Sequence, residues 1–427
     1  MDSNATTPLD PEVLQVITSA LETAWGNPSS NYETGVKAKV LINEARTHVA
    51  TMVRCKPENI IFTSGGTESN NMVLYSALQM FWEQQNTQAT GHTYLHRNSC
   101  SHRNVENENE TEDRICMRPH FITTNIEHDS ITKVLRHFQT EGLADVTYLP
   151  VSKMSGRVEA IQVLDALRPN TILVTVMLAN NETGVIQPVG EIARKLSTYS
   201  RSKFHTKVFL HTDASQAIGK IPVDVHKLGV DFLTITGHKF YGPRIGALYV
   251  SNPDDLFPIF YGGGQERGYR PGTENTAMIA GLGKAAELVV LNIEQYQDQM
   301  RVVRDYLEDS LQKQFQLRVM INGRYPTSER LPNTCNVSFL GEGLQGNKVL
   351  ARCRYFQASV GAACHSHMKY VCSQVLLASG VPPDVASNAI RLSIGRSTTK
   401  SDIDVIVNDL KAIVNLMLAE KVWPVKH

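Results

Sequence analysis

The chain has 427 residues, of which 42% are apolar, so it can bury a large core and form roughly two or three domains. Lys plus Arg and Asp plus Glu both total 42, which gives a formal net charge of zero. This balance excludes the strong basic field that a protein needs to bind nucleic acid or an anionic membrane surface. No continuous apolar run has the length of a bilayer-spanning helix, so we expect neither nucleic acid nor membrane as a partner.

Cysteine usage indicates a reducing compartment. The seven cysteines are odd in number, widely scattered and without a C-x-x-C pair, a pattern that favours free thiols over a disulfide framework. The first residues, MDSNATTPLDPEV, lack the basic and apolar regions of a secretory signal. We therefore expect the protein in the cytosol.

Hydrophobic patterning in the first 250 residues alternates between helix-like and strand-like runs. Two helices are predicted within 11–55, on either side of the turn-rich stretch 26–35. The strand-like runs that follow are 59–63, 120–124, 145–151, 171–179, 207–214, 231–236 and 245–250, and the helical stretches between them include 67–82, 129–140, 158–168 and 189–199. Continuously apolar strands in such an alternation predict an α/β domain with a mainly parallel sheet covered on both faces. Ligands on such sheets bind where the strands end.

From about residue 273 the pattern changes to one long helix, then strands near 333–340 and 391–395 and a closing helix at 401–418. We predict a large α/β domain at 12–255 and a smaller α+β domain formed by 256–427 together with 1–11. The polar segment 86–118 has no periodicity and is predicted to be an exposed insertion. Its histidines and cysteines lack the spacing of a zinc site, so we expect no metal.

Two motifs fall where such a sheet would place a ligand. In TSGGTESNN (63–71), Gly66 allows close backbone approach, and Thr67 at a helix N-terminus offers donors to a phosphate. A simple capped turn explains that motif equally well. Asp213 ends the strand 207–214, with Gln216 three residues later. A buried acid there needs a partner, although a helix cap is the alternative interpretation.

Lys239 lies between the strand-like runs 231–236 and 245–250. A lysine desolvated at a strand end is a candidate for a Schiff base, because burial lowers its pKa and frees the amine. A phosphate-type loop, an acid and such a lysine, in this order, are the parts that pyridoxal phosphate (PLP) requires. Each motif alone is weak, but the combination points to a PLP enzyme.

The motifs also carry a family resemblance along nearly the whole chain. They are D-x-N-A-T-T-P (2–8), GNPSS (26–30), SGGTESNN (64–71), NIEHDS (125–130), ANNETG (179–184), TDASQ (212–216), TGHKFYGPRIGALY (236–249), RPGTEN (270–275) and RLSIGR (391–396). The chain resembles the cysteine desulfurase-like enzymes, the class V aminotransferases of fold-type I among PLP-dependent proteins. The resemblance implies a large domain with a mainly parallel sheet and a smaller C-terminal α+β domain.

This resemblance implies a role for each matching residue. Lys239 would hold PLP covalently, and Asp213 would pair with its ring nitrogen. His128 would stack on the ring and shuttle protons. The remaining cofactor contacts would come from Asn181 and Gln216 at the 3′-oxygen and from Gly66, Thr67, Thr236 and His238 at the phosphate.

Two further residues would complete the site. Arg391 would bind the substrate carboxylate, with Asn181 beside it. Thr273 would reach the phosphate of the neighbouring subunit, which implies a homodimer with two sites at its interface.

The catalytic cysteine of the family matches Cys364, which small residues flank in ASVGAACHSHMKY (358–370). This stretch departs from the S-G-S-A-C-T-S that desulfurases commonly carry, and Asp129 follows His128 where they usually have lysine. Both departures, with the 86–118 insertion, resemble the selenium-specific branch of the family. They imply cleavage of L-selenocysteine to L-alanine and reduced selenium, with Asp129 as a specificity candidate and selenophosphate synthetase as an acceptor of the selenium.

Three alternatives remain open at this stage. A cysteine desulfurase that forms alanine and an enzyme persulfide would share every cofactor residue. An ordinary aminotransferase would leave Cys364 without a task. A catalytically silent selenium carrier or scaffold is a non-enzyme interpretation, against which the intact Lys239, Asp213 and Cys364 argue.

Overall fold

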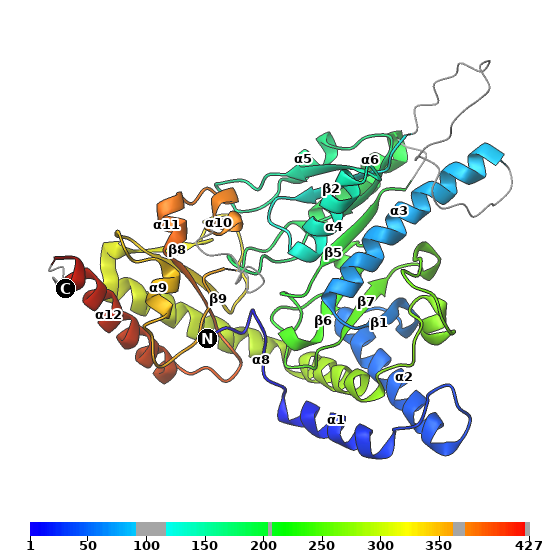
Figure 1. Ribbon diagram of the computed structural model, residues 1–427, viewed down its shortest axis with the longest axis horizontal. Helices are drawn as coiled ribbons and strands as arrows, with labels where there is room; N and C mark the ends of the chain where they lie inside the picture. Colours follow the sequence, from blue (N-terminus) through cyan, green and yellow to red (C-terminus); the bar gives the residue numbers. More distant parts are fainter. Residues whose placement is uncertain (91–116, 204–206, 362–371, 423–427) are drawn as a thin grey trace.

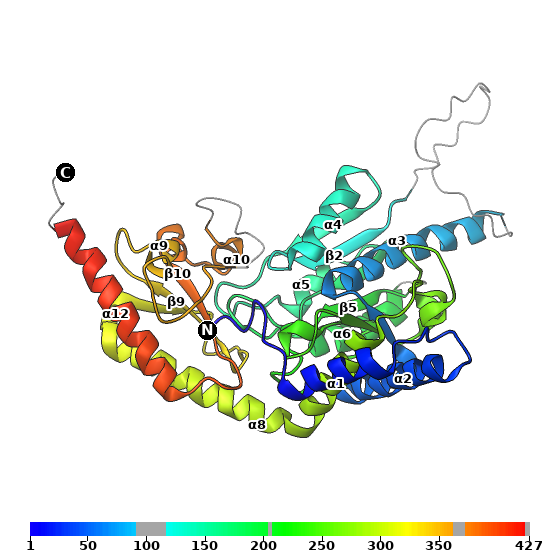
Figure 2. The ribbon, with the colours of Figure 1, turned by 60° about the horizontal axis from the view of Figure 1, so that its bottom comes forward.

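The fold is described by a computed structural model that covers residues 1–90, 117–203, 207–361 and 372–422. Most of the predicted insertion 86–118 and the predicted catalytic Cys364 therefore lie outside the described residues. A large α/β body and a smaller α+β body stand side by side, with one long helix running along both (Figures 1 and 2).

A seven-stranded sheet forms the centre of the large body. Its order is β1 (Ile60–Thr63), β7 (Gly246–Val250), β6 (Phe232–Thr236), β5 (Phe209–Asp213), β4 (Thr171–Thr175), β2 (His120–Thr124) and β3 (Asp145–Leu149). Strand β7 is antiparallel to both of its neighbours, and the other pairs are parallel. The predicted mainly parallel α/β sheet is confirmed, and the predicted strand-like runs all contain an observed strand.

Helices cover both faces of this sheet because successive strand residues point to opposite sides. On β1, Ile60 and Phe62 belong to one apolar core, whereas Ile61 belongs to the other. The first core also holds buried residues of α1 (Pro11–Thr23), α2 (Glu33–Val53), α5 (Ala160–Asp165) and α6 (Val189–Lys203). The second holds those of α3 (Gly66–Thr90) and α4 (Asp129–Thr140). The short α7 (Val225–Leu228) lies before β6.

The small body is built on an antiparallel sheet in the order β10 (Ala389–Ser393), β9 (Thr334–Phe339) and β8 (Val319–Asn322). Its core joins these strands to α12 (Lys400–Val422) and the second half of α8 (Thr276–Phe315). Three short helices complete it: α9 (Gly346–Leu350), α10 (Gln374–Ala378) and α11 (Pro383–Ser387). Sequence patterning did not predict β8, whose four residues are too few for a visible alternation.

The division between the two apolar cores falls inside α8, and the predicted domain boundary at 255/256 stays a prediction. Residues from Ala277 to Val289 pack in the large-body core, and those from Met300 to Phe315 pack in the small-body core. Among the described helices, α8 is the one long and apolar enough to span a membrane, and 56% of its most apolar window is buried within the fold. Residues 1–11 also join both bodies, because Asp2 pairs with Ser393 and Thr7 donates to the carbonyl of His238.

Candidate active site

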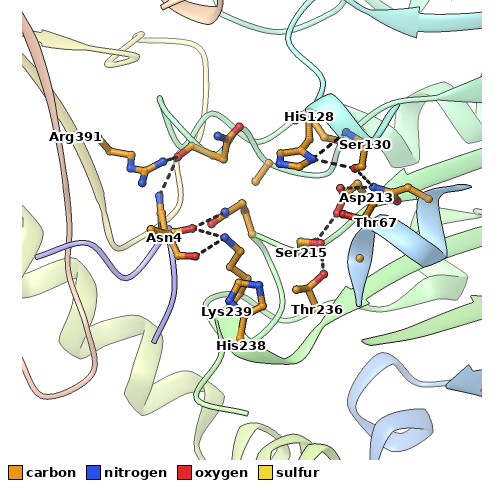
Figure 3. A pocket seen from close by; sticks show the side chains of 17 residues that line it. Asn4, Thr67, His128, Ser130, Asp213, Ser215, Thr236, His238, Lys239 and Arg391 are labelled. Carbon is orange, nitrogen blue, oxygen red and sulfur yellow. Dashed lines mark hydrogen bonds between the residues drawn. The ribbon is translucent and has the colours of Figure 1, made fainter. Parts of the chain in front are cut away.

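A cavity of about 270 Å³ opens where β5 and β6 end, beside β10 of the small body (Figure 3). Ten of the predicted site residues line it, namely Gly66, Thr67, His128, Asn181, Asp213, Gln216, Thr236, His238, Lys239 and Arg391. This gathering at the carboxyl edge of the sheet is where parallel strands place ligands.

The other three predicted residues do not line this cavity. Cys364 lies outside the described residues. Thr273 is exposed just before α8, so a contact with the phosphate of a neighbouring subunit stays a prediction. Asp129 stands at the first turn of α4, and its carboxylate lies 2.9 Å from the ammonium of Lys133.

Lys239 closes a short 3₁₀ turn, Gly237–Lys239, immediately after β6. Its side chain is partly buried, and its Nζ donates to the backbone carbonyls of Asn4 and Ala5, both at 2.7 Å. The N-terminal segment thus caps the lysine with neutral oxygen atoms. An amine held this way stands at the edge of the cavity, available for chemistry with a ligand.

Asp213 occupies the last position of β5 and is 8% exposed. Its Oδ2 accepts from Asn70 Nδ2 at 2.9 Å, and its Oδ1 accepts from the backbone N–H of Ser215 at 2.9 Å. Asn70 cannot flip freely, because its own Oδ1 accepts from Thr234 at 2.7 Å. The buried acid is therefore satisfied by neutral donors that stabilise the carboxylate and leave it facing the cavity.

The N-terminus of α3 and the hydroxyl-bearing residues Thr67, Ser215 and Thr236 form a cradle in the same cavity, next to Asp213. A Cβ on Gly66 would stand 2.3 Å from Thr236 Oγ1, so only glycine fits there. Ser215 Oγ and Thr236 Oγ1 are 2.7 Å apart. Burial, together with the charges of Lys239 and Arg244, lowers the pKa of His238 to about 4, so its ring is neutral at pH 7. Hydroxyls and a helix N-terminus are the groups that bind phosphate.

His128 caps α4, and its Nδ1 accepts from the backbone N–H of Ser130 at 3.1 Å. Because this bond uses the Nδ1 lone pair, the neutral ring carries its hydrogen on Nε2. The preceding Glu127 is 8% exposed and accepts from the Thr124 hydroxyl and the Met177 N–H. Burial raises the pKa of Glu127 to about 8. These bonds fix the loop from which His128 projects.

Arg391 enters the cavity from β10 and is only 1% exposed. Its Nη1 donates to the backbone carbonyl of Asn181 at 3.1 Å, and its Nη2 lies 2.8 Å from Asp2 Oδ1. The guanidinium is thus compensated by a carboxylate of the same chain. A guanidinium at this place can bind the carboxylate of an amino acid.

Sequence reasoning missed several residues that this site uses. Asn70 lies one turn along α3 from Thr67 and shares its face, which the helical period of SGGTESNN could have revealed. Ser130 lies in the quoted NIEHDS motif. Asp2 and Asn4 were quoted only as part of the D-x-N-A-T-T-P match. Lys220 donates from a buried position to Gln216 at 2.8 Å and to Asn4 at 3.2 Å, and no spacing predicts this contact.

Among the described residues, no group of three or more His, Cys, Asp or Glu side chains is placed to hold a metal ion. The histidines and cysteines of the predicted insertion, from His92 to Cys116, lie outside those residues. The amine, carboxylate, phosphate-type cradle and guanidinium instead make this a site for a phosphorylated cofactor and an amino acid.

Comparison with known proteins agrees with this class. The aminotransferase class-V family model matches residues 1–112 and 104–406, and the chain belongs to this family. A NifS-like protein of known structure covers 97% of this chain and 98% of its own length, with a TM-score of 0.78 and 29% identity.

Two curated relatives are similar along most of the chain. Selenocysteine lyase of Rattus norvegicus is 54% identical over 421 residues, which cover 97% of this chain and 94% of the rat protein. Cysteine desulfurase IscS of Dictyoglomus turgidum is 36% identical over 417 residues, which cover 97% of this chain and 94% of that protein. The identity to the selenocysteine lyase is the higher by a wide margin.

Proposed function

We propose that this protein is a PLP-dependent selenocysteine lyase, which cleaves L-selenocysteine to L-alanine and reduced selenium. The observation that carries the proposal is the 54% identity to a selenocysteine lyase, against 36% to a cysteine desulfurase, over nearly the same length. The cavity supports it, because it joins an amine, a buried carboxylate and a guanidinium in one place.

PLP fits the residues that line this cavity. Gly66 leaves room at the cradle that any larger residue would fill, and Thr67, Thr236 and His238 surround it. Asp213 offers a carboxylate already fixed by two donors. The Lys239 amine lines the same cavity. Residues that would bind phosphate, a ring nitrogen and an aldehyde therefore face one space.

When bound, PLP supplies an electron sink for the α-carbon of the amino acid. Asp213 would place a negative charge near the ring nitrogen and would favour a proton there. Arg391 would bind the substrate carboxylate and would orient the amino acid towards Lys239. Once displaced by the substrate, the Lys239 amine would take the proton from Cα and give it up on the cofactor side rather than back to Cα, which would weaken the carbon–selenium bond. His128, with its hydrogen on Nε2, can donate towards the cofactor.

Cys364 is assigned to the selenium by its sequence position, five residues after Ser359 on the segment that follows α9. Its thiolate would accept the selenium as a selenopersulfide while the electron pair of the broken carbon–selenium bond stays on the carbon that becomes alanine, and a thiol reductant would then release the selenide. We further propose a cytosolic homodimer in which Thr273 reaches the partner's phosphate site. Selenophosphate synthetase is the acceptor that we propose for the released selenium.

The decisive test quantifies alanine, selenide and sulfide released from L-selenocysteine and from L-cysteine in the presence of a thiol reductant. We expect selenocysteine to be turned over at least about tenfold faster, which needs only about 1.4 kcal/mol of barrier difference. A selenol is more acidic than a thiol and leaves carbon more readily. Equal rates of selenide and sulfide release would make the cysteine desulfurase the better proposal.

Asp129 is the residue that we propose to help set this preference. It carries a negative charge at the start of α4, next to His128, where desulfurases usually have a positive one. Asp129→Lys should raise sulfide release relative to selenide release. Because Asp129 lies outside the cavity lining and contacts Lys133, we expect a change of only several-fold. Lys133→Ala, which removes the contact but keeps the Asp129 charge, is the matched control and should leave the ratio nearly unchanged.

A further inference from the structure

Arg391, which we expect to bind the substrate carboxylate, already forms an ion pair with a carboxylate of this chain. Arg391 Nη2 lies 2.8 Å from Asp2 Oδ1, and this is the one carboxylate within ion-pair distance of Arg391 in the described part of the chain. Asp2 Oδ2 accepts from the hydroxyl of Ser359 at 2.6 Å. Both oxygens of Asp2 are therefore engaged, and the carboxylate is fixed in its place beside Arg391.

Backbone pairing builds this contact into the fold. Asp2 forms a parallel bridge with Ser393, and Ser359 forms an antiparallel bridge with Arg391. The backbone N–H of Arg391 donates to the Ser359 carbonyl at 2.6 Å. Asp2 therefore reaches Arg391 from a strand-like segment beside β10, and the contact does not depend on a free side chain folding back from the surface.

Two of the three guanidinium nitrogens already have an acceptor in this chain. Nη2 pairs with Asp2, Nη1 donates to the Asn181 carbonyl, and Nε has no hydrogen-bond partner among the described residues. A carboxylate needs two adjacent N–H groups for a bidentate contact. A substrate carboxylate must therefore share Nη2 with Asp2 or displace one of the present acceptors, and it then lies close to a fixed like charge.

We infer that Asp2 competes with the substrate carboxylate for Arg391 and thereby weakens the binding of amino-acid substrate and product. The inference rests on the proposed function, because it takes Arg391 as the carboxylate-binding residue. This competition favours fast release of L-alanine. Without Asp2, the product carboxylate would be held by a buried guanidinium that has no counter-charge. Asp2 also keeps that cation neutralised when no ligand is bound.

The alternative is that Asp2 only holds Arg391 in place, and an isosteric change separates the two roles. Asp2→Asn keeps an oxygen for Arg391 and a polar partner for Ser359 but removes the charge. If Asp2 competes, Asp2→Asn tightens the binding of a carboxylate ligand. If Asp2 only positions the guanidinium, the same change weakens that binding or leaves it unaltered. Asp2→Glu retains the charge and should not tighten it.

The experiment titrates the PLP-loaded protein with L-alanine and with ethylamine, which lacks only the carboxylate, and follows the absorbance of the bound cofactor. We expect Asp2→Asn to bind L-alanine about tenfold more tightly than wild type, equal to about 1.4 kcal/mol, with ethylamine binding unchanged. Asp10→Asn, in the same N-terminal segment at the cap of α1, is the matched control and should behave as wild type.

Kinetics should agree with this titration. The Asp2→Asn variant should show a lower KM for L-selenocysteine without a higher kcat, because alanine leaves more slowly. The inference would be overturned if Asp2→Asn bound L-alanine no more tightly than wild type does. It would also be overturned if the variant gained as much affinity for ethylamine as for L-alanine. Neither result touches the proposed lyase activity, which fails separately if selenide and sulfide are released equally fast.

Discussion

The two ends of the cavity are built in different ways. The end that would hold PLP lies on the large body, where Asp213 and Thr236 occupy the last positions of neighbouring strands. The end that would hold the amino-acid carboxylate is assembled from Arg391 on β10 and the N-terminal segment. Cofactor binding therefore depends on one rigid framework, whereas substrate binding depends on how separate parts of the chain meet.

Asn4 joins these two ends. It is 1% exposed, and its carbonyl accepts from Lys239 while its Nδ2 donates to Thr334 of the small body at 2.8 Å. Its Oδ1 accepts from Lys220 and Asn333. Asn4 therefore links the small body directly to the lysine by hydrogen bonds.

The largest loss should follow removal of the lysine. Lys239→Ala removes both the covalent anchor and the group that moves the Cα proton, so turnover should fall at least about 10³-fold. Borohydride reduction of wild type, followed by peptide mapping, should place the pyridoxyl group on Lys239. Lys220 is the internal control, since it is buried nearby but does not line the cavity. An adduct on Lys220 would contradict the assignment.

The Cys364→Ala variant should distinguish cofactor binding from the chemistry on selenium. Cys364→Ala should reduce selenide formation about 10²-fold or more while the cofactor absorbance stays intact, because the thiol acts on selenium and not on PLP. Cys372→Ala is the matched control, since burial raises the pKa of that thiol and makes it a poor nucleophile. A variant without Cys364 that loses its cofactor would mean that this residue supports the large body instead.

The large-body end could be predicted from sequence far better than the substrate end. Gly66, Asp213 and Lys239 follow directly from apolar strands, and the end of a parallel strand fixes where such residues gather. The contact between Asp2 and Arg391 joins residues 389 positions apart. No local period encodes such a distant pair, so only the folded structure reveals it. The helix α8 is shared by two cores for a related reason, because its first half packs in one core and its second half in the other.

Loss of the Asp213 charge should affect the cofactor end more mildly than loss of Lys239. Asp213→Asn keeps the shape of the side chain but no longer favours a proton on the ring nitrogen, so we expect turnover to fall on the order of 10²-fold. The absorbance of the bound cofactor should shift as well. Asn70→Asp places a second acid beside Asp213 at 2.9 Å and should also impair turnover. Near-normal turnover of Asp213→Asn would show that the electron sink works without this carboxylate.

The smallest effect concerns Glu127, which ties the loop of His128 to the backbone of Met177. Burial raises its pKa to about 8 in the folded protein, whereas an ordinary glutamate in the unfolded chain has a pKa of 4.5. Between these values the folded state binds more protons than the unfolded state. The free energy of unfolding therefore falls as pH rises from about 4.5 towards 8.

Glu127→Gln cannot ionise and should remove this pH dependence. We expect the Tm of wild type relative to Glu127→Gln to decrease by a few degrees (~2 to 4 °C) between pH 5 and pH 8. Glu294→Gln, at an exposed position of α8, is the matched control. Thermal unfolding across this range, followed by circular dichroism, measures the difference. If the Tm difference between wild type and Glu127→Gln stayed constant from pH 5 to pH 8, Glu127 would already be ionised at pH 5. A buried carboxylate, rather than a neutral acid, would then hold the loop of His128.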